Sequence, residues 1–224
     1  MGHGLFLQGE AQPWILWDWL FSHVSRFTDA LQQHIALTFI AVTLALVISL
    51  PLGVAAQRWR VVRNPAFVIF GIVYTIPSIA LFALLIPYTG LSATTAEIGL
   101  VGYAVLIILR NVVVGLDSVP PDVVDAANGM GYRPLARLLR VELPLALPAI
   151  FAGVRIATVT TIGLVTITAV IGLGGLGQLI EEGLVDDFRT PLVVATVLSI
   201  LLALVADLFL AGVQKVALPW SRSA

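Results

Sequence analysis

The run LALPAIFAGVRIATVTTIGLVTITAVI, from Leu145 to Ile171, carries one charge, Arg155, in a stretch long enough to cross a membrane. A hydrocarbon core of about 30 Å requires roughly 20 residues of α-helix. The rest of the chain has the same character: of 224 residues, 59% are hydrophobic and 11% are charged, and the mean hydropathy is +1.01. A soluble domain of this length could not bury so much apolar surface, so the composition predicts an integral membrane protein.

Four further apolar runs are long enough to span a bilayer. The five predicted transmembrane helices are residues 35–56, 66–87, 98–116, 145–171 and 192–213. The runs lack the strict alternation of apolar and polar residues that a membrane β-barrel requires. We therefore predict an all-α bundle of about five helices, with a transmembrane domain over residues 31–213 and a tail over residues 214–224.

The N-terminal residues 1–30 are expected to lie outside the bundle. The stretch 13–34 is interrupted by Asp18, His23, Arg26 and Asp29, while three tryptophans, Trp14, Trp17 and Trp19, suit the headgroup region of a membrane. This pattern predicts an interfacial helix on the outer face. A partial sixth span is the alternative.

The cations of the short loops predict the orientation, because Lys and Arg favour cytoplasmic loops. They gather after the first span, after the third span and at the C-terminal end: Arg58, Arg60, Arg63, Arg133, Arg137, Arg140, Lys215 and Arg222. Residues 88–97 contain no Lys or Arg, and residues 172–191 contain only Arg189. We therefore expect the N-terminus outside and the C-terminus in the cytoplasm.

The segment DAANGMGYRPLARLLRVELP, from Asp125 to Pro144, lies on the predicted cytoplasmic side. Gly129 and Gly131 permit a backbone reversal between two short helices, the second starting at Pro134. Its arginines share one face, and we expect its leucines, Leu135, Leu138 and Leu139, to face the bundle. The segment, within a coupling loop of residues 118–144, is predicted to form a rigid knob that re-enters the membrane at Pro144. Anchoring to anionic lipid is the alternative, which explains the arginines but not the glycine joint.

The same segment resembles the EAA motif of the type I ABC importer permeases. The matching residues, with the spacing of the motif intact, are Asp125, Ala126, Ala127, Gly131, Leu143 and Pro144. The one departure is Asp125, where the motif usually has glutamate; the shorter side chain keeps the charge. The resemblance extends from about Leu31 to Val213.

The resemblance implies a set of partners in a bacterial-type inner membrane. The knob is then the coupling helix that docks on a cytoplasmic ATPase subunit, beside a second permease subunit, identical or paralogous, and an external solute-binding protein. The chain has no G-x-x-x-x-G-K-[ST] phosphate loop, so we expect it to be no enzyme and to bind no cofactor, with ATP and Mg held by the ATPase. We expect no nucleic-acid partner.

Two other segments resemble permeases for glycine betaine, carnitine and choline. They are GLGGLGQLIEEGL, from Gly172 to Leu184, and YTIPSIALFALLIPYTGL, from Tyr74 to Leu91. The resemblance implies uptake of quaternary ammonium osmoprotectants that a binding protein delivers. The glycines of the first segment also fit G-x-G-x-x-G, but that fingerprint requires a soluble βαβ unit. The alternatives are a permease for another small solute of the amino-acid type and, less favoured, a secondary transporter, since no internal repeat is visible.

Pro77 divides the predicted second span and is expected to kink it and free a carbonyl toward a central cavity. Nearby side chains could line a pathway for a methylated cation, which aromatic faces hold well. The candidates are Tyr74, Thr75, Pro77, Ser78 and Phe82. The alternative is that Pro77 kinks a packed helix and the aromatic side chains fill the core.

The remaining polar residues favour structural roles. Arg155 and Asp207 lie at similar depths in the fourth and fifth spans, so we expect a salt bridge between them. The alternative has Arg155 reaching cytoplasmic water or backbone carbonyls. His34 and Glu97 are expected to be solvated at the outer ends of their spans. The scattered histidines, with no H-E-x-x-H pattern, predict no metal site.

Overall fold

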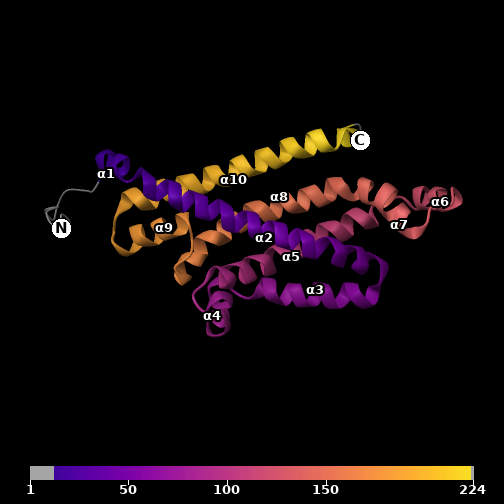
Figure 1. The fold of residues 1–224 in the computed structure, drawn as a ribbon, viewed down its shortest axis with the longest axis horizontal. Helices are drawn as coiled ribbons and strands as arrows, with labels where there is room; N and C mark the ends of the chain where they lie inside the picture. The colour runs from indigo at the N-terminus through magenta and orange to yellow at the C-terminus, as the bar shows by residue number, and fades with distance from the viewer. Residues whose placement is uncertain (1–12, 223–224) are drawn as a thin grey trace.

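The computed structural model describes residues 13–222, and every regular element in that range is a helix (Figure 1). The elements are α1 (Trp17–Ser22), α2 (Val24–Arg58), α3 (Arg60–Thr75), α4 (Ser78–Thr89), α5 (Ala93–Asp117), α6 (Pro121–Gly129), α7 (Pro134–Arg137), the π-helical turn η1 (Leu138–Glu142), α8 (Leu143–Ile167), the 3₁₀ turn η2 (Thr168–Ile171), α9 (Leu176–Val185), α10 (Arg189–Ala217) and the 3₁₀ turn η3 (Pro219–Arg222). The predicted all-α fold is confirmed.

Four helical stretches within residues 13–222 are long and apolar enough to cross a membrane: α2, α5, the continuous run Pro134–Ile171, and α10. A fifth candidate exists only if α3 and α4 count as one span, and these two helices are bent by 100° relative to each other. The bundle of about five helices is therefore correct in count only with this broken span included.

The prediction of one kinked helix over residues 66–87 was wrong, because two separate helices occupy this stretch. Ile76 and Pro77 both adopt extended backbone, with ψ angles of 128° and 133°, so the helix stops and a new one begins. Proline cannot donate a backbone hydrogen bond, and it disfavours helical geometry in the residue before it. Both effects act at the same point, and they produce a break rather than a bend.

The first span begins earlier than expected. α2 starts at Val24 and continues without interruption to Arg58, so only α1 matches the predicted separate interfacial helix. One of the polar residues that suggested a break has a partner, since Arg26 pairs with Glu182 of α9. The next residue, Phe27, is buried against α9 and α10. The predicted N-terminal segment extends into residues 1–12, outside the described residues.

The core of the bundle lies between α2, α5 and α8, and α5 makes its most extensive contacts with the other two. Small residues bring the helix backbones close together. A Cβ atom at Gly53 would meet Val112 at 2.4 Å, and one at Gly115 would meet the carbonyl oxygen of Ala146 at 2.8 Å. Close approach of this kind is how helices pack in a membrane, where apolar burial supplies little driving force.

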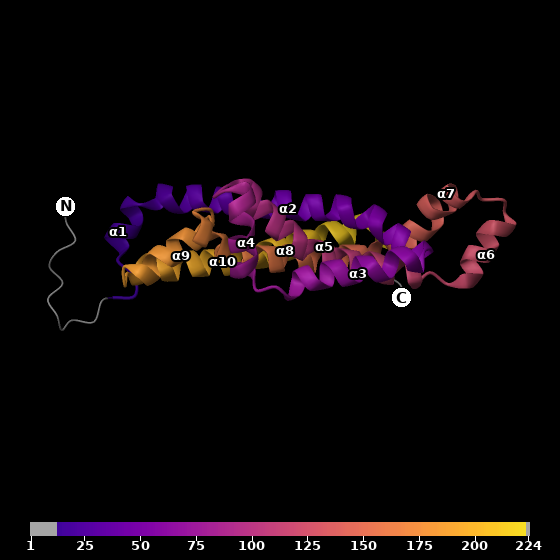
Figure 2. The ribbon, with the colours of Figure 1, turned by 90° about the horizontal axis from the view of Figure 1, so that it is seen from below.

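Figures 1 and 2 show an elongated bundle with a helical hairpin extending from one end, while α1 and α9 lie at the other. The hairpin consists of α6, α7 and η1 (residues 121–142), and we call it the protruding hairpin. α10 lies along the outside of the bundle, and only 6% of its most apolar window is buried. Most of its apolar surface is therefore available to lipid or to another protein.

Candidate functional site

The protruding hairpin reverses direction at a single glycine. Gly131 has φ +83°, a left-handed conformation that favours glycine, whereas Gly129 lies inside α6 with ordinary helical geometry. Two backbone hydrogen bonds close the turn, from Gly131 N to Asn128 O (2.9 Å) and from Tyr132 N to Ala127 O (3.1 Å). α7 then begins at Pro134, as predicted.

The base of the hairpin is a π-helical turn instead of a break. Pro144 has no N–H to offer the carbonyl of Arg140, and the backbone widens so that Leu143 N donates to Leu138 O. The helix therefore runs on from α7 through η1 into α8. Consequently the hairpin is joined rigidly to a membrane-spanning helix, and Pro144 sits within that helix near its start.

The residues that match the coupling motif divide between two surfaces. Asp125 and Ala126 are exposed on α6, but Ala127 is only 1% exposed and faces the interior of the hairpin. Of the two alanines, only Ala126 is therefore placed to allow the close approach of a partner. Leu143 and Pro144 are half-buried at the base, where Leu143 packs on the core cluster.

The three arginines of this segment do not act alike. Arg137 is turned inward, with its side chain 14% exposed, and its Nε donates to Glu142 Oε1 at 2.6 Å. Its Nη1 donates to Asn128 Oδ1 at 2.5 Å. Arg133 and Arg140 are exposed. The pairing was missed because residues five apart face each other in a π turn, whereas an α-helix brings together residues three or four apart.

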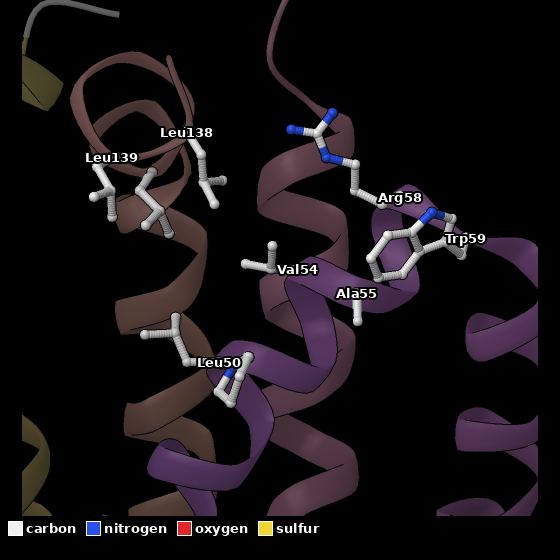
Figure 3. Close-up of a pocket in the computed structure, with 9 residues that line it drawn as sticks. Leu50, Val54, Ala55, Arg58, Trp59, Leu138 and Leu139 are labelled. Carbon is white, nitrogen blue, oxygen red and sulfur yellow. The ribbon is translucent and has the colours of Figure 1, made fainter. Parts of the chain in front are cut away.

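The leucines of the hairpin were also placed incorrectly. Leu135 and Leu139 are 67% and 55% exposed, and only Leu138 packs on the core. Across from Leu138 and Leu139 lie the last turns of α2, and the two sides enclose an apolar groove of about 420 Å³ (Figure 3). Other residues that line it are Leu50, Pro51, Val54, Ala55, Arg58, Trp59 and Leu143.

The break between α3 and α4 places the candidate pathway residues. Tyr74 is 43% exposed, and its ring meets the edge of Tyr103 with 5.8 Å between centroids. The Tyr103 hydroxyl donates to Ile76 O. In a continuous helix Pro77 would leave Val73 O without a donor, but Val73 O accepts from Ile76 N at 3.3 Å, so the expected free carbonyl is not present. Pro77 is exposed and Ser78 is half-buried, while the Thr75 hydroxyl donates to Ile72 O at 2.7 Å.

Phe82 does not lie on an accessible surface in this conformation. It is fully buried, and its ring occupies the space beside Gly99, where a Cβ atom would meet it at 2.4 Å. The alternative interpretation, an aromatic side chain that fills the core, describes Phe82. Tyr74, Thr75 and Pro77 are the exposed members of the candidate set.

Arg155 and Asp207 form the expected salt bridge between α8 and α10. Arg155 Nε donates to Asp207 Oδ1 and Arg155 Nη2 donates to Asp207 Oδ2, both at 2.8 Å. The side chains are 31% and 32% exposed. Two parallel charge-assisted bonds fix both distance and orientation, so the pair ties the middle of α10 to the bundle.

His34 and Glu97 are not solvated in the way we expected. His34 is fully buried in α2, and its Nε2 lies 3.0 Å from Ile162 O of α8. Both carboxylate oxygens of Glu97 are buried without a hydrogen-bond partner in the described part of the chain. Sequence position near a helix end did not reveal this, because tertiary packing on α2 and α5 covers these groups.

The glycine-rich corner between η2 and α9 is a close contact between backbones. A Cβ atom at Gly177 would meet Thr166 O at 2.3 Å, and one at Gly175 would meet Ala30 O at 2.6 Å. Gln33 Oε1 accepts a hydrogen bond from Gly175 N at 2.9 Å. The glycines therefore serve close packing between α2, α8 and α9.

Together these features define a class: a multi-pass helical membrane protein in which an exposed hairpin is continuous with a spanning helix. The family model for the binding-protein-dependent transport system inner membrane component matches residues 45–215. The chain belongs to this family, and it is the permease component of an ABC importer.

Several curated relatives match most of the chain. The osmoprotectant import permease protein OsmW of Salmonella typhimurium is 40% identical, over 84% of this chain and 89% of the relative. The choline transport system permease protein OpuBB of Bacillus subtilis is 35% identical, over 82% and 84%. The glycine betaine/carnitine/choline transport system permease protein OpuCB of the same organism is 34% identical, over 84% and 86%.

A solved structure shares the fold. A chain from inward facing conformations of the MetNI methionine ABC transporter superposes with a TM-score of 0.78 at 24% identity. The match covers 87% of this chain and 97% of the other. At this identity the likeness speaks to architecture and not to the transported solute.

Proposed function

We propose that this permease forms the translocation pathway of an ATP-driven importer for quaternary ammonium osmoprotectants of the glycine betaine, carnitine and choline type. The observation that carries the proposal is the protruding hairpin, which presents Asp125 and Ala126 outward on a rigid extension of a spanning helix. The relatives named for osmoprotectants and choline, at 40% and 35% identity, support the solute class.

The hairpin end of the bundle faces the cytoplasm in this proposal. Exposed cations lie at that end, on the link after α2 and on the hairpin: Arg58, Arg60, Arg133 and Arg140. The opposite end carries acids in α9 and in the link to α10, including Glu181, Asp186 and Asp187. This asymmetry follows the preference of positive charge for the cytoplasmic side.

The ATPase subunit docks on the outward face of α6. Asp125 on this face offers a carboxylate to a basic partner, and Ala126 offers a small side chain that permits close approach. The chain contains no phosphate loop, so ATP and its Mg are held by that separate subunit. Movement of the docked hairpin reaches the membrane through the continuous helix Pro134–Ile171.

A second permease subunit completes the pathway. The exposed apolar face of α10, with Leu201, Leu204 and Leu208, leaves a surface for lipid or for such a subunit. The solute-binding protein approaches the end that carries α1 and α9. It selects the solute, while the permease offers a weaker, transient route in which the exposed ring of Tyr74 contacts the methylated cation.

Reconstitution tests the solute class. The permease, its ATPase and its binding protein are placed in liposomes, and ATP-dependent uptake of choline, glycine betaine and carnitine is compared with uptake of methionine. We expect uptake of at least one quaternary ammonium compound and none of methionine. Methionine uptake alone would assign the other solute class, and uptake that persists without ATP and the ATPase would make the protein a secondary transporter.

A further inference from the structure

Arg137 connects three parts of the protruding hairpin through its side chain. One bond reaches Asn128 in the last turn of α6, the other reaches Glu142 in η1, and Arg137 itself ends α7. Glu142 is buried, so its carboxylate depends on this guanidinium for its charge partner. The side chain therefore spans the angle between the two arms of the hairpin.

The backbone at the tip does not fix that angle alone. The reversal is made by Gly131, and nothing lies within 4 Å of the position that a Cβ atom would occupy there. Glycine has the widest range of backbone conformations, and this one is not enclosed by neighbouring atoms. Rotation about this joint would swing α6 relative to α7 unless side chains hold the two arms together.

The bundle does not hold the hairpin from the side of α2. Leu138 and Leu139 are separated from the last turns of α2 by the apolar groove (Figure 3). α6 packs mainly on α7 and η1, where Ala127 is enclosed. The contacts that set the direction of α6 are therefore internal to the hairpin.

We infer that Arg137 is a positioning residue for coupling: its links to Asn128 and Glu142 hold α6 at a fixed angle to α8, so that force at α6 reaches the membrane. The inference rests on the proposed function, because it assigns α6 as the surface that the ATPase moves. The motif residues on α6 contact the ATPase, and Arg137 keeps α6 from rotating relative to α8. The π turn is part of the device, since it brings Glu142 within reach of Arg137.

The geometry can be measured without any partner. The chain contains no cysteine, so Asp122→Cys on α6 and Leu145→Cys on α8 give two unique sites for spin labels. We expect a narrow distance distribution in the otherwise unchanged chain and a clearly broader one in Arg137→Gln. Arg140→Gln is the matched control, because it removes the same charge from an exposed side chain three residues along.

Coupling is then measured on the reconstituted importer as solute molecules taken up per ATP hydrolysed. We expect Arg137→Gln to lower this ratio by about tenfold, within the usual range of coupling between sites, and Arg140→Gln to leave it unchanged. Arg137→Lys keeps a charge for Glu142 but loses the fork that also reaches Asn128, so an intermediate ratio is expected. A lower uptake with an unchanged ratio would indicate a merely structural role and overturn the inference.

A variant at the other end of the Arg137–Glu142 bond tests the inference even if Arg137→Gln does not fold. Glu142→Gln leaves Arg137 in place, and it should broaden the same distance distribution in protein that inserts and purifies normally. An unchanged distribution in both Arg137→Gln and Glu142→Gln would contradict the inference whatever the transport result. Absence of ATP-dependent uptake in the unmodified importer would instead contradict the proposed function, and the distance measurement would still test the link itself.

Discussion

At the scale of single residues, the Arg155–Asp207 pair shows how charge is accommodated in an apolar helix. The residues of α10 that are buried, Thr190, Pro191 and Ala195, all lie near its start, so the salt bridge fastens the half of the helix that packing holds least. Because both side chains are partly exposed, solvent screens the pair, and it contributes less stability than a fully buried pair would.

Substitution of one partner should therefore lower the free energy of unfolding more than substitution of both. Arg155→Ala leaves the Asp207 carboxylate without its cation, and we expect the free energy of unfolding in detergent to fall measurably. Arg155→Ala combined with Asp207→Asn should recover part of that loss. Ile156→Ala, at an exposed neighbouring position, is the control. A double variant whose loss equals the sum of the two single losses would show that the side chains do not interact.

This pair and the turn at Gly131 were predictable from the sequence because each depends on a strong local rule. Two opposite charges at equal depth in hydrocarbon require partners, and a tight reversal requires a left-handed residue. The Arg137–Glu142 bond escaped the same reasoning because it depends on the helical register. Proline at position 144 was the available signal, since it removes a donor and favours a wider turn just before it.

At the scale of elements, the break between α3 and α4 has a defined anchor. The hydroxyl of Tyr103 on α5 bonds the carbonyl of Ile76, the residue whose extended conformation separates the two helices. The helical bundle thereby holds the break open instead of leaving a flexible joint.

Removal of this hydroxyl should loosen the break. Tyr103→Phe leaves the Ile76 carbonyl without its donor, and we expect a loss of about 1 kcal/mol in the free energy of unfolding together with faster amide hydrogen exchange in residues 76–80. Tyr88→Phe removes a hydroxyl from an exposed ring and should change neither quantity. Equal exchange in both variants would mean that packing alone maintains the break.

The positions of the spanning helices were predictable from composition, but two of their boundaries were not. Runs of apolar residues located α2, α5, α8 and α10 because length and hydropathy decide whether a helix can span. α2 was predicted too short because Arg26 in its polar first turns pairs with Glu182 of α9. α3 and α4 were predicted as one helix because hydropathy contains no information on the direction of a helix axis.

At the scale of the whole molecule, the proposed orientation can be read from labelling. Met130→Cys places a thiol near the tip of the protruding hairpin, and Asp186→Cys places one between α9 and α10 at the opposite end. In intact cells we expect a membrane-impermeant maleimide to label Asp186→Cys only. Labelling of Met130→Cys before permeabilisation would reverse the orientation and remove the basis for docking an ATPase on α6.

The central claim is that the outward face of the protruding hairpin transmits ATP hydrolysis to solute uptake. Asp125→Arg reverses the charge on that face at the coupling motif, whereas Asp122→Arg makes the same change on the same helix outside the motif. An arginine at a docking surface repels a basic partner. Comparison of the two variants therefore distinguishes an effect of the motif position from an effect of charge anywhere on α6.

The most direct test is uptake of choline per ATP hydrolysed in liposomes that contain the permease, its ATPase and its binding protein. We expect Asp125→Arg to lower this ratio by about tenfold or more while the permease inserts and folds normally, and Asp122→Arg to retain most of it. A normal ratio for Asp125→Arg would contradict the account, because coupling would then pass through another part of the molecule.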